Sequence, residues 1–483
     1  MNLSSATMMS DLASVAPEVF LMVTGILVLL LGALLPRLSR LWIPLSSAAV
    51  VGAGWLVFTQ MDQVGTSFGG FLEWSPVTAA GSQVVLLSGL LALLASQSYL
   101  RRERLLTAEY AALILWCMVG LLLLLRSTEL LTLFVALELL SFCLYALAAY
   151  HRRYAVSIEA GVKYFLMGAF VSAFVLLGIA LLYGETGSTR IDPVGAALAR
   201  GQGSGLLVTL GVLLLVCGFG FKLSVVPFHT WAPDAYQGAP SPFVAFFSVA
   251  PKAASALVVF RVLLELGAPM VETNWTGLVS FLAIASIVVG NLLALVQKDI
   301  KRMLAYSGVA HMGYLLIPLA STDMDSLPPL LVYLLAYALM NAGAFVVVGF
   351  LYGRPGEQHL ISEISGWGYR FPYLALGLTV FMLSLGGLPP TLGFLGKYLV
   401  FAHAIQHGHW LLALVGIAGS LVGIFYYLRV VYVLYMKDEV LEPSGLRFDL
   451  WGNLSVGLAI AGTLLLGIFP ARVLSWLQQA ILY

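Results

Sequence analysis

Long apolar runs separated by short polar segments occupy most of the chain. Each run is close to the about 20 residues that a helix needs to cross a bilayer. The pattern therefore predicts an all-α, polytopic membrane protein with about 14 transmembrane helices. The expected spans are 17–36, 41–59, 77–99, 108–126, 129–150, 157–183, 206–226, 242–264, 276–297, 302–320, 328–352, 372–405, 410–436 and 450–469.

Prolines and glycines interrupt two of these runs, the seventh and the twelfth. The segment FKLSVVPFHTWAPDAYQGAPSP (221–242) follows the seventh run, and SLGGLPPTLGFLGKYLVF (384–401) lies inside the twelfth. Proline removes a backbone donor and clashes with the preceding helical turn, so both helices are expected to break. Broken backbone at membrane depth is tolerated only where it is buried in protein or lines a watery cavity. Both breaks therefore indicate a path for ions or protons.

Composition supports a membrane protein and narrows its possible functions. The chain is 60% hydrophobic and 10% charged, whereas a soluble domain has about 25% charged residues. The net charge is +1 and basic tracts are absent, so we expect no nucleic-acid partner. The three cysteines are far apart and form no CxxC motif, so we expect no iron–sulfur or zinc site.

Basic residues in the loops predict the orientation in the membrane. Of the 18 Lys and Arg residues outside the spans, 14 lie in loops after odd-numbered spans and 4 in loops after even-numbered spans. Loops rich in Lys and Arg face the cytoplasm. Both termini are therefore expected on the opposite side.

Four lysines fall well inside the expected spans, namely Lys163, Lys222, Lys252 and Lys397. A charge at the centre of a bilayer costs about 2.5–3.5 kcal/mol on insertion scales. Packing alone does not explain four such groups. We therefore interpret them as stations for ions or protons.

A few other ionisable residues also lie at membrane depth. Glu138 is in the middle of the fifth span, where it can be a structural counter-ion or an electrostatic switch that pairs with a lysine and releases it. His229 lies in the first interruption and His311 within the tenth span. A neutral imidazole both donates and accepts, which suits a proton relay, although a hydrogen-bonded core histidine explains His311 as well.

Three further histidines, His403, His407 and His409, lie near the end of the twelfth span. Their proximity in sequence is compatible with metal binding. No acid or cysteine accompanies them in this stretch. We therefore interpret them as part of a solvated loop and expect no metal site.

Nearly equal spacings point to an internal repeat. The lysines of the two interruptions, Lys222 and Lys397, differ in sequence number by 175 (397 − 222), and Glu138 and His311 differ by 173 (311 − 138). Spans four to eight are thus expected to recur as spans nine to thirteen, and because five is odd, the second copy is inverted. The expected regions are the N-terminal helices 1–107, the first repeat 108–268, the inverted repeat 269–440 and the C-terminal helix 441–483.

The two repeats are not equivalent in charge. The same spacing, taken as 174, pairs Lys163 with Tyr337 and Lys252 with Tyr426. A lysine of the first repeat is thus replaced by a tyrosine of the second at both positions. A path that starts in one repeat and ends in the other is therefore a natural hypothesis.

Three segments resemble one known family in the same order along the chain. FKLSVVPFHTWAPDAYQGAP resembles the broken seventh helix of the antiporter-like subunits of respiratory complex I, and IKRMLAYSGVAHMGYLL and LGGLPPTLGFLGKYLV are similar to later parts of the same subunits. The resemblance covers nearly the whole chain. Its Glu and Lys positions are occupied here by Glu138, Lys222, Lys252 and Lys397, and Lys163 matches a further lysine on the sixth helix.

The resemblance implies a subunit that translocates protons across a bacterial inner membrane. It implies that NADH, FMN, iron–sulfur clusters and quinone bind to other subunits, so this chain would hold no redox cofactor and no catalytic residue. The implied partners are the antiporter-like subunits M and L and the small subunits K, J and A. In the implied relay, Glu138 and Lys222 form a switching pair and Lys397 is the exit-side station. The other residues of that relay are Lys252, His311, Tyr426, His229 and Lys163.

Two other functions stay open at this point. The chain can be a subunit of a multisubunit cation/proton antiporter, which has a similar core and would show sodium-dependent exchange without NADH oxidation. It can also be a scaffold whose buried charges only fix helix packing, in which case substitutions would impair assembly rather than transport.

Overall fold

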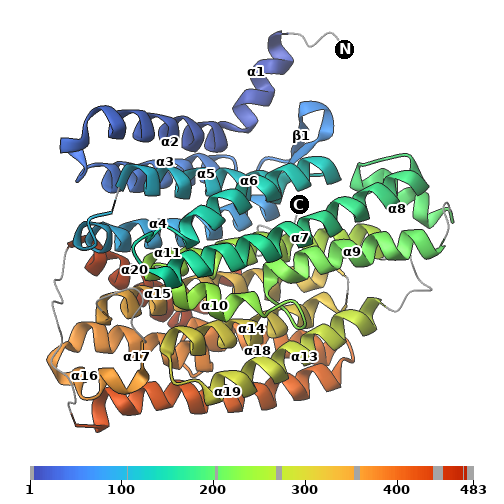
Figure 1. Ribbon diagram of the computed structural model, residues 1–483. Coiled ribbons are helices and arrows are strands. Elements are labelled where there is room, and N and C mark those ends of the chain that lie inside the picture. Colours follow the sequence, from blue (N-terminus) through green and yellow to red (C-terminus); the bar gives the residue numbers. More distant parts are fainter. Residues whose placement is uncertain are drawn as a thin grey trace.

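The computed structural model describes residues 5–105, 107–201, 205–267, 275–321, 323–352, 359–438, 450–471 and 473–475. Long helices run roughly side by side and form one thick bundle (Figure 1). The region boundaries expected at 268/269 and 440/441, both chain ends, and the loop residues Arg354, Arg447 and Arg472 lie outside the described residues.

The N-terminal region forms the first layer of the bundle (Figure 1). A two-stranded antiparallel hairpin, β1 with β2, connects the third helix to the fourth. The elements are α1 (Ser5–Ser14), α2 (Ala16–Leu34), α3 (Trp42–Thr59), β1 (Gly65–Ser67), β2 (Leu72–Trp74) and α4 (Pro76–Arg102).

The first predicted repeat contains four long helices and several short ones. They are α5 (Thr107–Arg126), α6 (Leu130–Ala148), α7 (Ala155–Thr186), α8 (Ile191–Ala199), α9 (Gly205–Leu223), α10 (Trp231–Gly238), α11 (Ser241–Phe247) and α12 (Ala250–Val262), followed by a π-helical turn, Leu263–Gly267.

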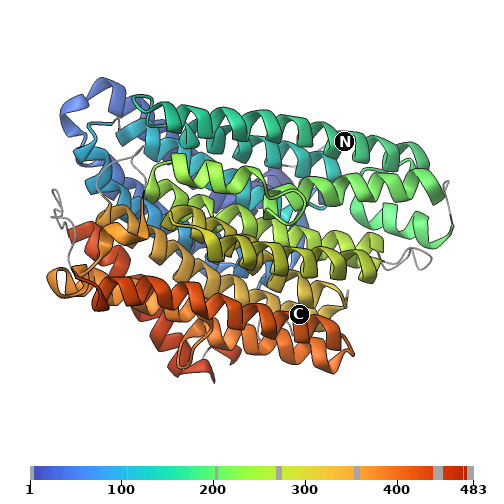
Figure 2. The same ribbon diagram turned by 60° about the horizontal axis from the view of Figure 1, so that its bottom comes forward.

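The second repeat and the last helix lie along the opposite long side of the bundle, coloured yellow to red in Figure 2. Their elements are α13 (Trp275–Val296), α14 (Ile300–Leu319), α15 (Leu327–Leu351), α16 (Trp367–Arg370), α17 (Pro372–Gly386), α18 (Leu392–Gln406), α19 (Trp410–Met436) and α20 (Leu450–Ile468).

Twelve helical segments among the described residues are long and apolar enough to cross a membrane. The other two predicted spans correspond to α14, whose first turn holds Lys301 and Arg302, and to the pair α17 and α18, which are 15 residues each. A polytopic all-α membrane fold is thus confirmed. The count of 14 stays a prediction.

Both predicted breaks are present. The helix α9 ends at Leu223, the next residue Ser224 has φ +60°, and α10 starts only at Trp231. In the second break, α17 ends at Gly386, and Gly387 closes it in the left-handed conformation with φ +81°, as glycine often does at helix C-termini.

A third break was not predicted. The eighth expected span, 242–264, was read as continuous, but it divides at Ser248–Val249 into α11 and α12. Pro251 lies in the first turn of α12, where a proline costs no hydrogen bond. The break places Lys252 in that first turn.

Backbone hydrogen bonds support the internal repeat. An acidic side chain caps the start of both α6 and α14, and the two capping residues, Glu129 and Asp299, differ in sequence number by 170 (299 − 129). The bond from Leu130 N to Thr189 O recurs as the bond from Ile300 N to His359 O, with donor and acceptor both shifted by 170. The expected offsets of 173 and 175 are thus too long at this point. An offset of 170 places Glu138 opposite Gly308, almost one turn before His311.

Helices differ strongly in how deeply they are buried. The segment Ser241–Leu266 and the helix α15 are buried almost throughout, at 100% and 94% of the spanning window. In contrast α2, α7, α19 and α20 are buried over only 28–33% of theirs. The centre of the bundle is therefore built from α11, α12 and α15. The outer helices turn apolar side chains outward, as expected for a face that meets lipid or other subunits.

Candidate functional site

Three of the four lysines that we expected deep in the spans are buried. The exposed fractions are 4% for Lys222, 1% for Lys252 and 5% for Lys397. Lys163 differs from them, because 45% of its side chain is exposed, and its role in a proton path stays a prediction. It lies on an outward face of α7, which the sequence of a largely apolar helix does not reveal.

Glu138 and Lys222 lie close together but form no direct ion pair in the described part of the chain. Glu138 is half-buried and accepts a hydrogen bond of 2.5 Å from the Ser172 hydroxyl on α7. The Lys222 ammonium donates to Ser141 Oγ at 2.7 Å. Ser141 lies three residues after Glu138, so the two side chains project from similar faces of α6, and Ser141 ties Lys222 to the helix that carries Glu138.

An aromatic cluster lies between Lys222 and Lys252. The Lys222 nitrogen is 5.4 Å from the Tyr164 ring centre, and the Lys252 nitrogen is 5.6 Å from that of Tyr236. The Trp231 ring lies between the two tyrosines, 4.6 Å from Tyr164 and 6.0 Å from Tyr236. Each lysine thus gains a cation–π contact from the same cluster.

Lys252 has the least support for its charge. Among the described residues its ammonium has no hydrogen-bond partner. It is in the first turn of α12, an end of a helix that favours negative rather than positive charge. Gly308 of α14 makes room for it, since a Cβ at Gly308 would be 3.1 Å from Lys252 Nζ and 2.9 Å from the Tyr337 hydroxyl.

His311 is buried at the centre of a hydrogen-bonded group. Its Nδ1 is 2.7 Å from the Tyr333 hydroxyl, and its Nε2 is 3.1 Å from the Tyr427 hydroxyl. The Tyr427 hydroxyl is in turn 2.5 Å from Ser307 Oγ. Both ring nitrogens therefore have a hydroxyl partner that can donate or accept, which is the geometry that a relay needs. Tyr333, Tyr427 and Ser307 were not among the residues predicted from the sequence.

Two hydrogen bonds link Tyr426 through Asn291 to Tyr314, whose ring lies next to Lys397. The Tyr426 hydroxyl donates to Asn291 Oδ1 at 3.0 Å, and Asn291 Nδ2 donates to the Tyr314 hydroxyl at 3.0 Å. The Lys397 nitrogen is 5.2 Å from the Tyr314 ring centre. Asn291 was also missed, although a lone amide side chain in an apolar span was a visible signal.

Lys397 caps the end of α17 at the second break. Its ammonium donates to the carbonyl oxygens of Leu385 at 2.9 Å and Gly386 at 3.1 Å, and to Ser420 Oγ at 2.7 Å. The two carbonyls end α17, so the lysine of α18 caps that helix where its dipole favours a cation. A groove of about 570 Å³ between α18 and α19 leads from Lys397 and Ser420 to the surface.

A second polar network surrounds α10. Lys163 forms ion pairs with Glu159 at 2.7 Å and Asp234 at 2.9 Å, and Asp234 also pairs with Arg302 at 2.7 Å. Lys163 thus contacts α10 rather than Glu138. Lys301 lies just before the expected span 302–320, but it is buried and donates to two carbonyl groups at the C-terminal end of α10.

His229 is half-buried in the segment between α9 and α10. Its ring centre is 6.4 Å from that of Tyr306. No described contact joins it to a buried lysine. Its place in a relay stays a prediction.

The chain matches the family model "NADH:quinone oxidoreductase/Mrp antiporter, TM" over residues 127–423. It is 40% identical over 480 residues to NADH-quinone oxidoreductase subunit N of Trichlorobacter lovleyi, covering 98% of this chain and 97% of that one. Among solved structures, it matches a chain of respiratory complex I from Thermus thermophilus with a TM-score of 0.82 and 34% identity, covering 95% of this chain and 98% of that one.

A chain of the Mrp complex from Dietzia sp. has the same fold, with a TM-score of 0.85 at 20% identity and 97% of each chain covered. The chain belongs to the family of membrane subunits shared by NADH:quinone oxidoreductases and Mrp antiporters. Within this family its sequence places it with subunit N of NADH-quinone oxidoreductase.

Proposed function

We propose that this chain is a proton-translocating membrane-arm subunit of an NADH:quinone oxidoreductase. The observation that carries the proposal is the row of three buried lysines through the core, with a helix break beside each of them. Ionisable groups at membrane depth that face the bundle interior mark ion and proton pathways. Fold similarity does not separate this function from antiport, since the TM-scores are 0.82 and 0.85. Sequence identity separates them, at 34% and 20%.

In the proposed relay, Glu138 and Lys222 act as the input pair. When Glu138 carries its charge, Lys222 holds a proton in the aromatic cluster. When Lys222 breaks its hydrogen bond to Ser141 and moves away from Glu138, burial disfavours the charged ammonium, and the proton passes toward Lys252. The aromatic cluster offers no continuous hydrogen-bonded route between the two lysines, so this step needs a side-chain movement or water.

From Lys252 the proton would reach the second repeat through His311. The His311 group and the chain from Tyr426 through Asn291 converge near Tyr314 and Lys397. Lys397 would then release the proton through the groove beside α18. His229 and the network around Lys163 would lie on or near the input side.

The proposed setting follows from the family. The chain would lie in a bacterial inner membrane with both termini on the periplasmic side, next to subunits M and L and the small subunits K, J and A. NADH oxidation and quinone reduction, with FMN and iron–sulfur clusters, would take place in other subunits. Their energy would reach this chain as an electrostatic or conformational change.

The test is Lys222→Ala in the intact complex. After assembly has been checked, NADH:quinone turnover and the proton gradient are measured in the same membranes. We expect both to fall. Collapse of sodium/proton exchange with turnover unaffected would favour the antiporter, and loss of assembly alone would favour a scaffold.

A further inference from the structure

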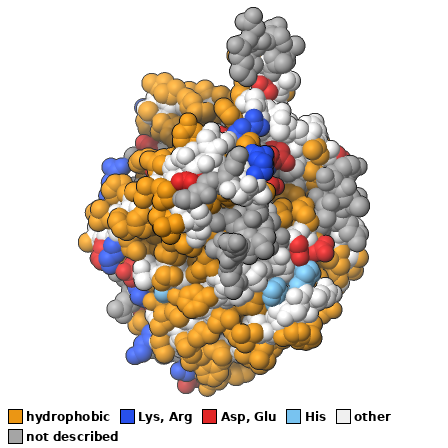
Figure 3. Space-filling model, turned by 90° about the vertical axis from the view of Figure 1, so that its right-hand side faces the viewer, with side chains coloured by type: hydrophobic (Ala, Val, Ile, Leu, Met, Phe, Trp, Pro, Cys, Tyr) orange, Lys and Arg blue, Asp and Glu red, His pale blue; other side chains and the backbone are white. Residues whose placement is uncertain are grey.

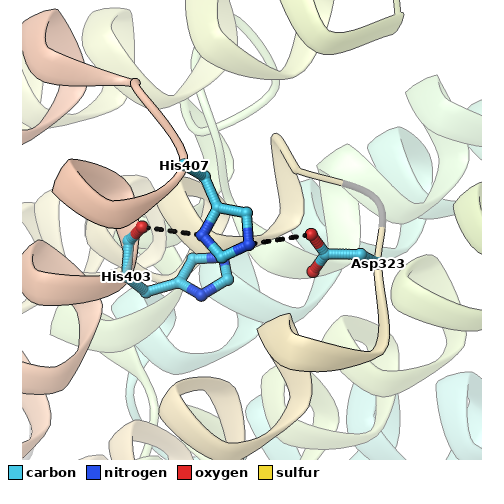
Figure 4. A group of neighbouring side chains, drawn as sticks. All are labelled: Asp323, His403 and His407. Atoms are coloured by element: carbon cyan, nitrogen blue, oxygen red, sulfur yellow. Dashed lines mark hydrogen bonds and ion pairs between the residues drawn. The ribbon is translucent and has the colours of Figure 1, made fainter.

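Two histidines and an acid meet at one end of α18. They are His403 in its last turn, His407 at its C-cap and Asp323 in the turn between α14 and α15 (Figure 4). Their ligand atoms all lie within 4.8 Å of one another. No acid lies near these histidines in the sequence, because α15, α16 and α17 separate Asp323 from them along the chain.

The two histidines lie side by side at this end of α18. They are four residues apart on one helix and therefore project from the same face. Their ring centres are 4.0 Å apart. His407 Nδ1 lies 3.0 Å from the backbone carbonyl of His403. A carbonyl only accepts, so Nδ1 carries the proton and the lone pair of a neutral ring is on Nε2.

That lone pair faces a carboxylate. His407 Nε2 is 3.1 Å from Asp323 Oδ2 (Figure 4). Two acceptors at this distance require a positive charge between them, which is either a second proton on the ring or a metal ion. A tetrahedral zinc site has ligand bonds of about 2.0–2.2 Å and thus neighbouring ligand atoms about 3.4 Å apart. The observed separation is close to that value.

The carboxylate is already held in position. Asp323 Oδ1 accepts from Ser326 N at 3.1 Å and from Ser326 Oγ at 2.9 Å, which leaves Oδ2 to face His407. Hydrogen bonds of this kind orient the ligands of metal sites. His403 is buried, whereas His407 and Asp323 are 27% and 37% exposed, so an ion could enter from the surface.

We propose that Asp323, His403 and His407 form a binding site for a divalent ion of the Zn²⁺ class. Two imidazoles and one carboxylate suit Zn²⁺, and also Ni²⁺ or Cu²⁺, better than Mg²⁺ or Ca²⁺. The ion would fasten the end of α18 to the turn between α14 and α15. Both segments follow even-numbered spans, so the site is on the predicted non-cytoplasmic side, where Figure 3 shows histidine beside acidic side chains.

The inference does not rest on the proposed function, since binding is measured without turnover. The intact complex in detergent is freed of metal with a chelator, and binding of Zn²⁺ is then titrated against a chromophoric competitor. Co²⁺ is used in parallel, because its visible absorption reports tetrahedral coordination. We expect one site whose affinity falls at least about tenfold in His407→Asn and in Asp323→Asn.

Two further variants make the test specific. Asp325→Asn removes the same charge from an exposed residue of the same turn and is expected to leave the affinity unchanged. Ser326→Ala removes one of the two hydrogen bonds that hold Asp323 Oδ1 and keeps the one from the backbone N–H, so it is expected to weaken binding less than Asp323→Asn does. Equal losses in Asp323→Asn and Asp325→Asn would show diffuse attraction and overturn the site. Unchanged affinity in His407→Asn, or Co²⁺ spectra without tetrahedral bands, would show that the contact is only a protonated ion pair.

Discussion

Lys252 and Lys397 are both buried, yet the fold treats their charges in opposite ways. Lys397 has three acceptors and sits at the C-terminal end of α17, where the helix dipole favours a cation. Lys252 has no hydrogen-bond partner among the described residues and sits in the first turn of α12. The surroundings of Lys397 thus stabilise its ammonium, whereas those of Lys252 provide almost no stabilisation of its charge.

The difference assigns different tasks to the two lysines. A group whose charge is poorly supported gives up its proton easily and suits transfer through the core. A group that also caps a helix changes the local structure when it loses its charge. Release of a proton from Lys397 would loosen the end of α17, so chemistry and conformation would be coupled at the second break.

The largest expected effect is the loss of proton transfer in Lys252→Met. We expect turnover and the proton gradient to fall at least about tenfold, as for other groups in a proton path. The fold should be unaffected or more stable, because replacing buried charge with an apolar side chain is often neutral or stabilising. Both quantities are measured on the purified complex, by turnover assay and thermal unfolding.

Lys437→Ala is the control for this variant, since Lys437 is an exposed lysine just after α19. Its turnover should match that of the parent complex. A complex with Lys252→Met that assembles poorly but pumps normally per molecule would contradict the assignment of Lys252 to the path.

The same change at Lys397 should combine loss of function with loss of stability. Lys397→Met leaves the Leu385 carbonyl without its donor, whereas the Gly386 carbonyl keeps a bond of 3.4 Å from Ser420 Oγ, and an unsatisfied buried group costs about 1–3 kcal/mol. Lys397→Arg separates the two roles, because arginine can still cap α17 but does not release its proton. We expect Lys397→Arg to be stable and inactive in the same two assays. An active Lys397→Arg complex would exclude proton release at this residue.

A smaller effect is expected from Gly308→Ala, which narrows the space around Lys252. The added methyl group would lie 3.1 Å from Lys252 Nζ and 2.9 Å from the Tyr337 hydroxyl, so the Tyr337 hydroxyl must shift and the lysine must move slightly. We expect turnover to fall a few-fold, about 1 kcal/mol in the barrier. Gly184→Ala in α7 is the control, because no atom lies within 4 Å of its Cβ position. Equal turnover in both variants would show that the position of Lys252 is not critical.

Much of this site could be predicted from the sequence, because prolines and buried charges in apolar runs leave few structural options. The breaks after Leu223 and Gly386 and the burial of three lysines are examples. The exposure of Lys163 could not be predicted, because an apolar helix does not reveal which face turns outward. Lys301 was also missed, since its burial depends on the carbonyl groups of α10, which come much earlier in the chain.

The repeat shows a similar limit. Pairing the polar residues deep in the fifth and tenth expected spans, Glu138 and His311, gave an offset of 173 residues. The hydrogen-bonded starts of α6 and α14 give an offset of 170 residues. The difference of three is nearly one turn of a helix, so the two matched side chains still lie on similar faces. The polar side chain at membrane depth therefore lies nearly one turn later in α14 than in α6, whereas the backbone hydrogen bonds that begin the two helices have the same register.

An effect of similar size is expected from Tyr426→Phe, which tests how the second repeat reaches Lys397. The change removes one hydroxyl and its hydrogen bond to Asn291, worth about 1 kcal/mol, while the contacts of His311 with the Tyr333 and Tyr427 hydroxyls stay in place. If protons use the chain through Asn291, turnover should fall about fivefold, while Tyr427→Phe, which removes a partner of His311, should cost more. Both are measured as turnover and proton gradient in the same membranes. A larger loss in Tyr426→Phe than in Tyr427→Phe would place the main route to Lys397 through Asn291 and Tyr314 instead of His311. Lys252 and Lys397 would then differ in the residues that carry protons to and from them, as well as in how their charges are stabilised.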